Sequence, residues 1–146
     1  MAKIILNKDF GGFSASYKAH KLYAKKKFNV DNIYVYNFEV NHDANLPYKT
    51  CYRRSDSAKD SVFNCYTIKD LGEVVHDIFD SEYALNLDES HREDPILIEI
   101  VEELGKEASG RYGCLEVVEI PDELVGNYMI DDYDGIETLH QKVQEY

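Results

Sequence analysis

The chain has 146 residues, of which 44% are hydrophobic and 30% are charged. These values are typical of one globular domain and exclude a disordered chain, and no apolar run approaches the roughly 18 residues that span a bilayer. Three cysteines without a Cys-x-x-Cys spacing indicate neither a disulfide framework nor a zinc site. The apolar stretch at the N-terminus is too short for a signal peptide. We therefore expect a single domain, residues 1–146, that stays in the cytoplasm.

The charge is polarised along the sequence. Residues 1–60 hold 11 Lys/Arg against 6 Asp/Glu, a balance of +5, whereas residues 61–146 hold 5 against 22, a balance of −17, so the net charge is −12. An acidic surface repels phosphates, which argues against direct binding of nucleic acid. It attracts a basic partner instead, although a solvated acidic face without a partner has the same composition.

The N-terminal third predicts a strand, a turn and a helix. Residues 3–7 are typical of a short buried strand, and the paired glycines within residues 9–13 indicate a turn. A helix follows, with Ser14 or Ser16 as its N-cap and residues 25–27, three lysines, at its C-terminal end.

The middle of the chain predicts β-structure. Residues 33–38, 48–54 and 62–68 are rich in aromatic and β-branched side chains, and we expect them to form an antiparallel β-meander over 33–68. The pattern of residues 70–79 favours a short helix. Residues 81–93 are acidic and without periodicity, so we expect a mobile acidic loop.

The C-terminal half predicts the best-defined helix, with Asp94 as its N-cap and Gly110 ending it in the left-handed conformation. Strands are expected at residues 115–120 and 128–130, and a last helix at 135–144. The fold class expected is therefore α+β, with a mainly antiparallel twisted sheet and two or three packed helices.

Three stretches together resemble a family of small uncharacterised phage and prophage proteins: KIILN with FGGFS at residues 3–14, DPILIEIVEELGKEASGR with VVEIPD at residues 94–122, and IDDYDGIE at residues 130–137. The resemblance covers roughly the first 27 residues and residues 91–139, and it leaves 29–90 outside. It implies an origin in a phage or mobile element and a role inside a bacterial cell. By that association, we expect a protein that binds a host or defence protein.

A partner surface is predicted on the long helix. Glu99, Glu103 and Glu107 follow one another at i, i+4 spacing and so line one exposed strip. Like charges so spaced slightly destabilise a helix, which favours a role in binding a host or defence protein with a basic surface.

A ligand site is the alternative. A glycine turn between a strand and a helix N-terminus can hold an anion through backbone N–H groups, so Gly11, Gly12, Phe13 and Ser14 are candidates for binding a nucleotide or signalling molecule, with Arg111 as an anion clamp. The glycine spacing of a P-loop or a dinucleotide fold is absent, and a purely structural turn remains the other interpretation.

No cofactor or catalytic set is predicted. The acidic run at residues 131–134 lacks both end ligands of a calcium loop, so no metal is expected. The only local cluster of catalytic residue types is residues 91–94, and nothing marks a nucleophile, so an enzyme is the third hypothesis. The oligomeric state stays open, a homo-oligomer included.

Overall fold

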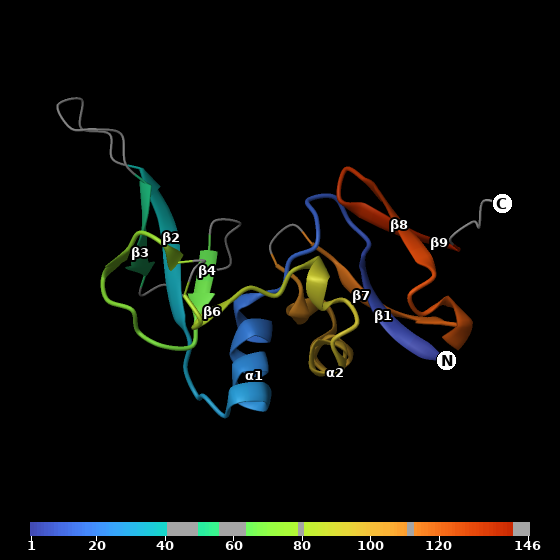
Figure 1. The fold of residues 1–146 in the computed structure, drawn as a ribbon, viewed down its shortest axis with the longest axis horizontal. Coiled ribbons are helices and arrows are strands. Elements are labelled where there is room, and N and C mark those ends of the chain that lie inside the picture. Colours follow the sequence, from blue (N-terminus) through green and yellow to red (C-terminus); the bar gives the residue numbers. More distant parts are fainter. Residues whose placement is uncertain (41–49, 56–63, 79–80, 111–112, 142–146) are drawn as a thin grey trace.

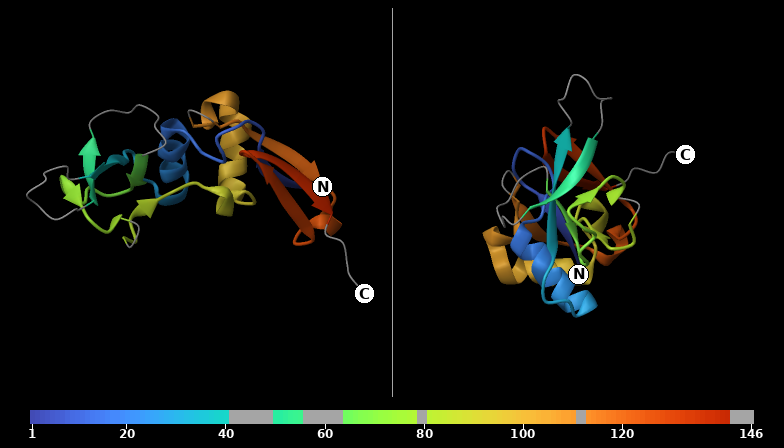
Figure 2. Two further views of the ribbon diagram at one scale, coloured as in Figure 1. Left: turned by 90° about the horizontal axis from the view of Figure 1, so that it is seen from above. Right: turned by 90° about the vertical axis from the view of Figure 1, so that its left-hand side faces the viewer.

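The computed structural model describes residues 1–40, 50–55, 64–78, 81–110 and 113–141. Over these residues the chain forms a single-domain α+β fold, with two α-helices and curled, antiparallel sheets. The molecule is elongated: a five-stranded sheet lies at one end, the helices lie in the middle, and two two-stranded sheets lie at the other end (Figures 1 and 2). None of the described helices has the length and apolar character needed to cross a membrane.

The first helix, α1 (Tyr17–Phe28), begins at Ser16, whose side chain accepts a hydrogen bond from Ala19 N at 3.0 Å. This decides between the two predicted N-caps. Ala19 and Tyr23 are buried, and the three lysines of residues 25–27 lie in the last turn as predicted. Asn29 then ends the helix with φ of 56°.

The second helix, α2 (Pro95–Leu104), has the predicted N-cap, because Asp94 accepts a hydrogen bond from Ile96 N at 2.9 Å. Its predicted end is wrong. Gly105 adopts φ of 59° and closes the helix five residues before Gly110, since a glycine there can leave the helical conformation without steric cost. A short 3-10 helix, η3 (Gly105–Ala108), follows.

The predicted strands at residues 3–7 and 115–120 are confirmed as β1 (Ala2–Asn7) and β7 (Leu115–Ile120), which pair antiparallel. Strand β1 is buried on both faces. Ile5 packs in the core that includes α1 and α2, whereas Ile4 and Leu6 pack on the opposite side, toward the C-terminal hairpin.

The C-terminal hairpin consists of β8 (Tyr128–Tyr133) and β9 (Ile136–Gln141), preceded by a turn of 3-10 helix, η4 (Asp122–Leu124). The helix predicted at 135–144 is therefore wrong over residues 135–141, and residues 142–144 lie outside the described part of the chain. Asp134 and Gly135 have φ of 54° and 96°, the two positive values that a tight hairpin turn requires. Ile130 and Leu139 pack against Ile4, Leu6 and Ile120 of the β1–β7 sheet.

The five-stranded sheet, which we call the central sheet because its strands come from the middle of the sequence, has the strand order β5-β3-β2-β4-β6. Its strands are β2 (Tyr34–Val40), β3 (Thr50–Ser55), β4 (Asn64–Thr67), β5 (Val74–Val75) and β6 (Ala84–Leu85). The three predicted strands are antiparallel, but they do not form a meander, because β2 lies between β3 and β4. Val35 and Tyr36 in this strand are 5% and 0% exposed, as is common for a strand that has a neighbour on each side.

The helix expected at residues 70–79 is wrong over the described residues 70–78. Residues 70–78 form a bend that leads through β5 to a buried Ile78, and Gly72, with φ of 100°, interrupts any helix there. Residues 81–93 contain β6 and the 3-10 helix η2 (Glu89–His91), and they are held in place by the buried Leu85 and Leu87.

The main core lies between the central sheet and the helices, and it continues onto one face of the β1–β7 sheet. Tyr23 of α1, Tyr66 of β4 and Leu97 of α2 meet in it. The two ends of the elongated molecule therefore share one apolar core through the helices.

Candidate partner-binding surface

The predicted acidic strip faces α1 rather than open solvent alone. Glu99 Oε1 lies 2.8 Å from Lys26 Nζ, and Glu103 Oε2 lies 3.5 Å from the same nitrogen. Glu107 belongs to η3 and forms its own ion pair with Lys18, Nζ to Oε2 at 2.8 Å. These contacts hold the pKa of Lys26 above its usual value, chiefly through the hydrogen bond that Lys26 donates to Glu99.

These pairs give the three glutamates a partner within the chain. The carboxylates remain half or more exposed, with side-chain exposures of 66%, 54% and 67% for Glu99, Glu103 and Glu107. Exposed pairs stabilise a fold only slightly, but they neutralise charge locally. The strip therefore presents less negative potential to a partner than its sequence indicates.

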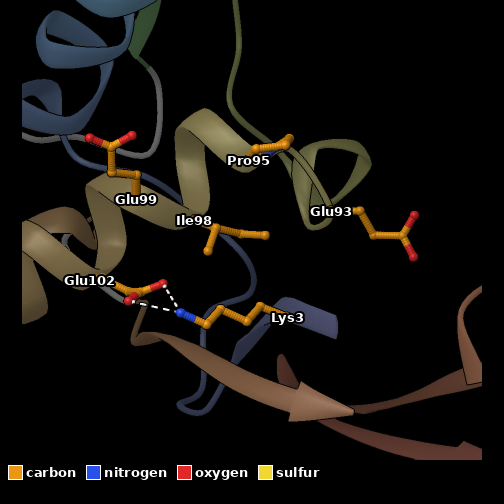
Figure 3. A pocket seen from close by; sticks show the side chains of 6 residues that line it. All are labelled: Lys3, Glu93, Pro95, Ile98, Glu99 and Glu102. Atoms are coloured by element: carbon orange, nitrogen blue, oxygen red, sulfur yellow. Dashed lines mark hydrogen bonds and ion pairs between the residues drawn. The ribbon is translucent and has the colours of Figure 1, made fainter. Parts of the chain in front are cut away.

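A shallow groove of about 430 Å³ lies on the other side of α2, next to β1 (Figure 3). Ile98 and Pro95 form its apolar wall, and Lys3 extends across it to Glu102, with Nζ–Oε1 and Nζ–Oε2 distances of 3.0 and 3.2 Å. Figure 3 places the Glu99 carboxylate away from this lysine. The Lys3 ammonium group therefore already lies in the groove, and it partly neutralises the Glu102 carboxylate.

The Gly11–Gly12 turn contacts the tip of the C-terminal hairpin. Gly11 N donates to Asp134 O at 3.4 Å, and a Cβ built on Gly135 would lie 2.6 Å from Gly11 N. Both turn glycines have positive φ, 104° and 89°. Because the hairpin occupies the backbone that was expected to receive an anion, these contacts favour the structural interpretation of the turn.

The other predicted ligand residues lie around the same turn. Phe13 packs against the main core, and its ring centroid lies 5.5 Å from the Arg92 guanidinium carbon. Ser14 O accepts a hydrogen bond from Gly110 N at 2.9 Å, so Gly110 lies next to the turn. Arg111 lies outside the described residues.

A buried polar cluster joins β1, β9 and the segment before α2. Glu137 and Arg92 form an ion pair, with side-chain exposures of 6% and 12%. Glu137 Oε1 also accepts from Asn7 N at 2.8 Å, and Arg92 Nη1 donates to Ile5 O at 3.0 Å. Arg92 belongs to the cluster singled out at residues 91–94, and its contacts assign it a structural role.

The outer face of the β8–β9 hairpin combines exposed apolar side chains with carboxylates. Alternation along β8 places Met129, Asp131 and Tyr133 on this face, opposite the side that covers β1. Met129 is 52% exposed and Tyr133 is 79% exposed. Asp131 pairs with His140 Nε2 at 2.9 Å, and Asp132 Oδ1 accepts from Gly135 N at 2.8 Å.

Sequence reasoning missed this face because it assigned β9 to a helix. The Asp134-Gly135 pair was the available indication of a hairpin turn. Among the described residues, no group of three or more His, Cys, Asp or Glu side chains is placed to hold a metal ion.

His20 is a titratable group inside the main core, 3% exposed. Its Nδ1 lies 2.7 Å from Ser16 O, and its Nε2 accepts from Leu87 N at 3.1 Å, which fixes a neutral ring with the proton on Nδ1. Burial lowers its pKa from 6.5 to about 4. The ring stacks on Tyr66 with centroids 4.0 Å apart, so it helps to join α1 to the central sheet.

Comparison with protein-family models, with curated proteins and with solved structures gives no match for this chain.

Proposed function

We propose that this chain is a phage-type accessory protein that binds a host or defence protein stoichiometrically in the bacterial cytoplasm. The proposed partner has a basic surface, and the proposed binding surface is the outer face of the β8–β9 hairpin. This keeps the acidic C-terminal half as the binding half and moves its centre from the glutamate strip to the hairpin.

One observation carries the proposal: Tyr133 and Met129 are exposed on the same face of one hairpin, at 79% and 52%. Tyrosine and methionine are enriched in protein interfaces, and hot spots are large side chains surrounded by polar groups. Here Asp131 lies between them on the same face of the strand. Such a face supports anchoring by the two large side chains and guidance of a basic partner by the carboxylate.

The glutamate strip supports a secondary role. Glu99, Glu103 and Glu107 each have a lysine of α1 within 3.5 Å, so their charge is partly cancelled before any partner arrives. A contribution to the rate of association remains consistent with their exposure.

The test compares four forms of the protein in affinity capture from bacterial cells, followed by association kinetics with the captured partner. They are the parent, a hairpin variant (Met129→Ser with Tyr133→Ser), a strip variant (Glu99→Gln, Glu103→Gln and Glu107→Gln), and a control. The control is Phe38→Ser, because Phe38 is also exposed, at 41%, but lies on the central sheet.

We expect the parent and the control to capture the same partner in a 1:1 ratio, and the hairpin variant to lose it. The strip variant should associate more slowly at low salt only. Exposed charges act mainly on the rate of encounter, and added salt screens that effect. A partner retained in full by the folded hairpin variant would refute the proposed surface.

A further inference from the structure

A second pocket, of about 350 Å³, lies at the C-terminal end of α1, next to β6 and η2. Side chains from all three regions line it, among them Tyr23, Lys27, Phe28, Leu85, Asn86 and His91. Its volume falls within the range of small-molecule sites, about 300–1,000 Å³. It is separate from the hairpin face, so a ligand here would be independent of the proposed partner.

Lys27 supplies the positive charge of this pocket. Its neighbours in the sequence are already paired, Lys25 with Asp31 at 2.7 Å and Lys26 with Glu99 at 2.8 Å. Within the described parts of the chain, no carboxylate forms an ion pair with Lys27. In a protein of net charge −12, a lysine in a pocket without a carboxylate partner is a distinct feature.

Tyr23 fixes the position of this ammonium group. The Tyr23 hydroxyl donates to Asp94 Oδ2, so its oxygen is left to accept from Lys27 Nζ at 3.2 Å. The same nitrogen lies 5.5 Å from the Tyr23 ring centroid and 5.6 Å from the Phe28 ring centroid. An ammonium group has three donors, and this contact uses one, so two can serve a ligand.

The remaining lining suits a molecule with a flat apolar part. Phe28 is 44% exposed, and the buried Leu85 adds an apolar surface. His91 Nδ1 lies 3.3 Å from Ser90 Oγ and 3.5 Å from Asp88 Oδ1, which leaves Nε2 for another partner. The Asn86 amide provides both a donor and an acceptor.

We propose that this pocket binds a small organic anion: a planar ring that carries a carboxylate or a phosphate. The anionic group contacts Lys27, with His91 or Asn86 as a further donor, and the ring packs against Phe28. Attraction to Lys27 and contact with the exposed aromatic ring each contribute, so neither the charge nor the ring alone gives full affinity.

The test uses phenyl phosphate as the probe, with inorganic phosphate as the charge without the ring and benzyl alcohol as the ring without the charge. Backbone amide chemical shifts of the ¹⁵N-labelled protein report both the place and the affinity of binding. The variants are Lys27→Met and Phe28→Ala. The matched control is Lys21→Met, on the exposed side of the same helix.

We expect phenyl phosphate to cause saturable shifts at the amides around Lys27, Asn86 and His91. Lys27→Met should weaken binding at least about 10-fold, or ~1.4 kcal/mol, because it removes a charge-assisted hydrogen bond. Lys21→Met should bind as the parent does. Inorganic phosphate and benzyl alcohol should each bind more weakly than phenyl phosphate.

Three results would overturn the proposal: no saturable shift at these amides, equal binding by inorganic phosphate alone, or equal binding by Lys27→Met. Overlay of the variant spectra with the parent outside the pocket verifies the fold. If Lys27→Met fails that check, Phe28→Ala decides instead, and unchanged affinity there overturns the proposed ring contact.

Discussion

The Arg92 guanidinium and the Glu137 carboxylate meet at two points across 45 residues of sequence, with Nη2–Oε2 at 2.8 Å and Nη1–Oε1 at 3.2 Å. Asn7 N donates to the same carboxylate, so one acidic side chain joins β9, β1 and the segment before α2. Because the pair is almost fully enclosed, its loss should lower the stability of the C-terminal half strongly.

Glu137→Ala should lower the free energy of unfolding by about 3–5 kcal/mol, because the substitution leaves a buried guanidinium without its counter-charge. Chemical denaturation monitored by circular dichroism measures this. The control is Asp131→Ala, which removes an exposed partner of His140, with side-chain exposures of 67% and 57%. A loss for Glu137→Ala no larger than that of the control would contradict the structural role assigned to the pair.

Stability should fall as the pH drops from 6.5 toward 4. The unfolded chain protonates His20 near pH 6.5, whereas the folded chain does not do so until about pH 4, so the unfolded state binds more protons in this window. At about 1.4 kcal/mol per pKa unit, the loss approaches ~3 kcal/mol.

His20→Gln should flatten this dependence, because the amide can donate to Ser16 O and accept from Leu87 N without titrating. The control His76→Gln changes an exposed histidine and should leave the profile as in the parent. Unfolding free energies between pH 5 and 6.5, above the main carboxylate range, test this. Equal slopes for the parent and His20→Gln would disprove it.

Gly135→Ala should destabilise the protein more than Gly126→Ala. Both glycines have positive φ, 96° and 78°, so each alanine carries a similar backbone cost of about 1–2 kcal/mol. Gly126 faces open space, whereas a Cβ on Gly135 would meet the backbone of Gly11 and Gly12. The difference between the two melting temperatures therefore isolates the contact between hairpin and turn, and identical values would show that the hairpin tip does not rest on that turn.

Leu97→Ala should cost about 2–5 kcal/mol, since Leu97 is fully buried in the main core. Leu104→Ala should cost less, because Leu104 is the last residue of α2 and is only partly buried against the same core. Denaturation midpoints of the two variants give the comparison. The reverse order would mean that α2 packs around its C-terminal end instead.

Local sequence patterns correctly predicted the elements that are determined by residues close together in the chain. The Asp94-Pro95 start of α2, the strand at β1 and the strand at β7 depend on short-range capping and on apolar runs. The end of α2 could also have been predicted, since a glycine after Leu104 is a normal helix terminus. The apolar residues continue at helical spacing to Ala108, however, and this pattern favoured a longer helix.

Long-range pairing could not be predicted in the same way. Nothing near Glu137 in the sequence indicates that Arg92 is its partner, and nothing in β2 indicates that it pairs with β3 and β4 on opposite sides. The lysine partners of Glu99 and Glu107 belong to α1, some 70 to 90 residues earlier in the sequence. The sequence pattern therefore predicted a glutamate strip whose charge is not neutralised within the chain. Such contacts depend on the packing of one element against another.

The position of β1 has a consequence for folding during synthesis. Asn7 bonds to Cys114 and Glu137, which follow it by 107 and 130 residues, so the first strand is translated long before its partners exist. At about 5–20 residues per second, this delay is on the order of ten seconds. Contacts this far apart also slow folding, because the chain must close a large loop before they form. Until then Ile4, Ile5 and Leu6, which are buried in the folded protein, have no partner strand and stay accessible to solvent.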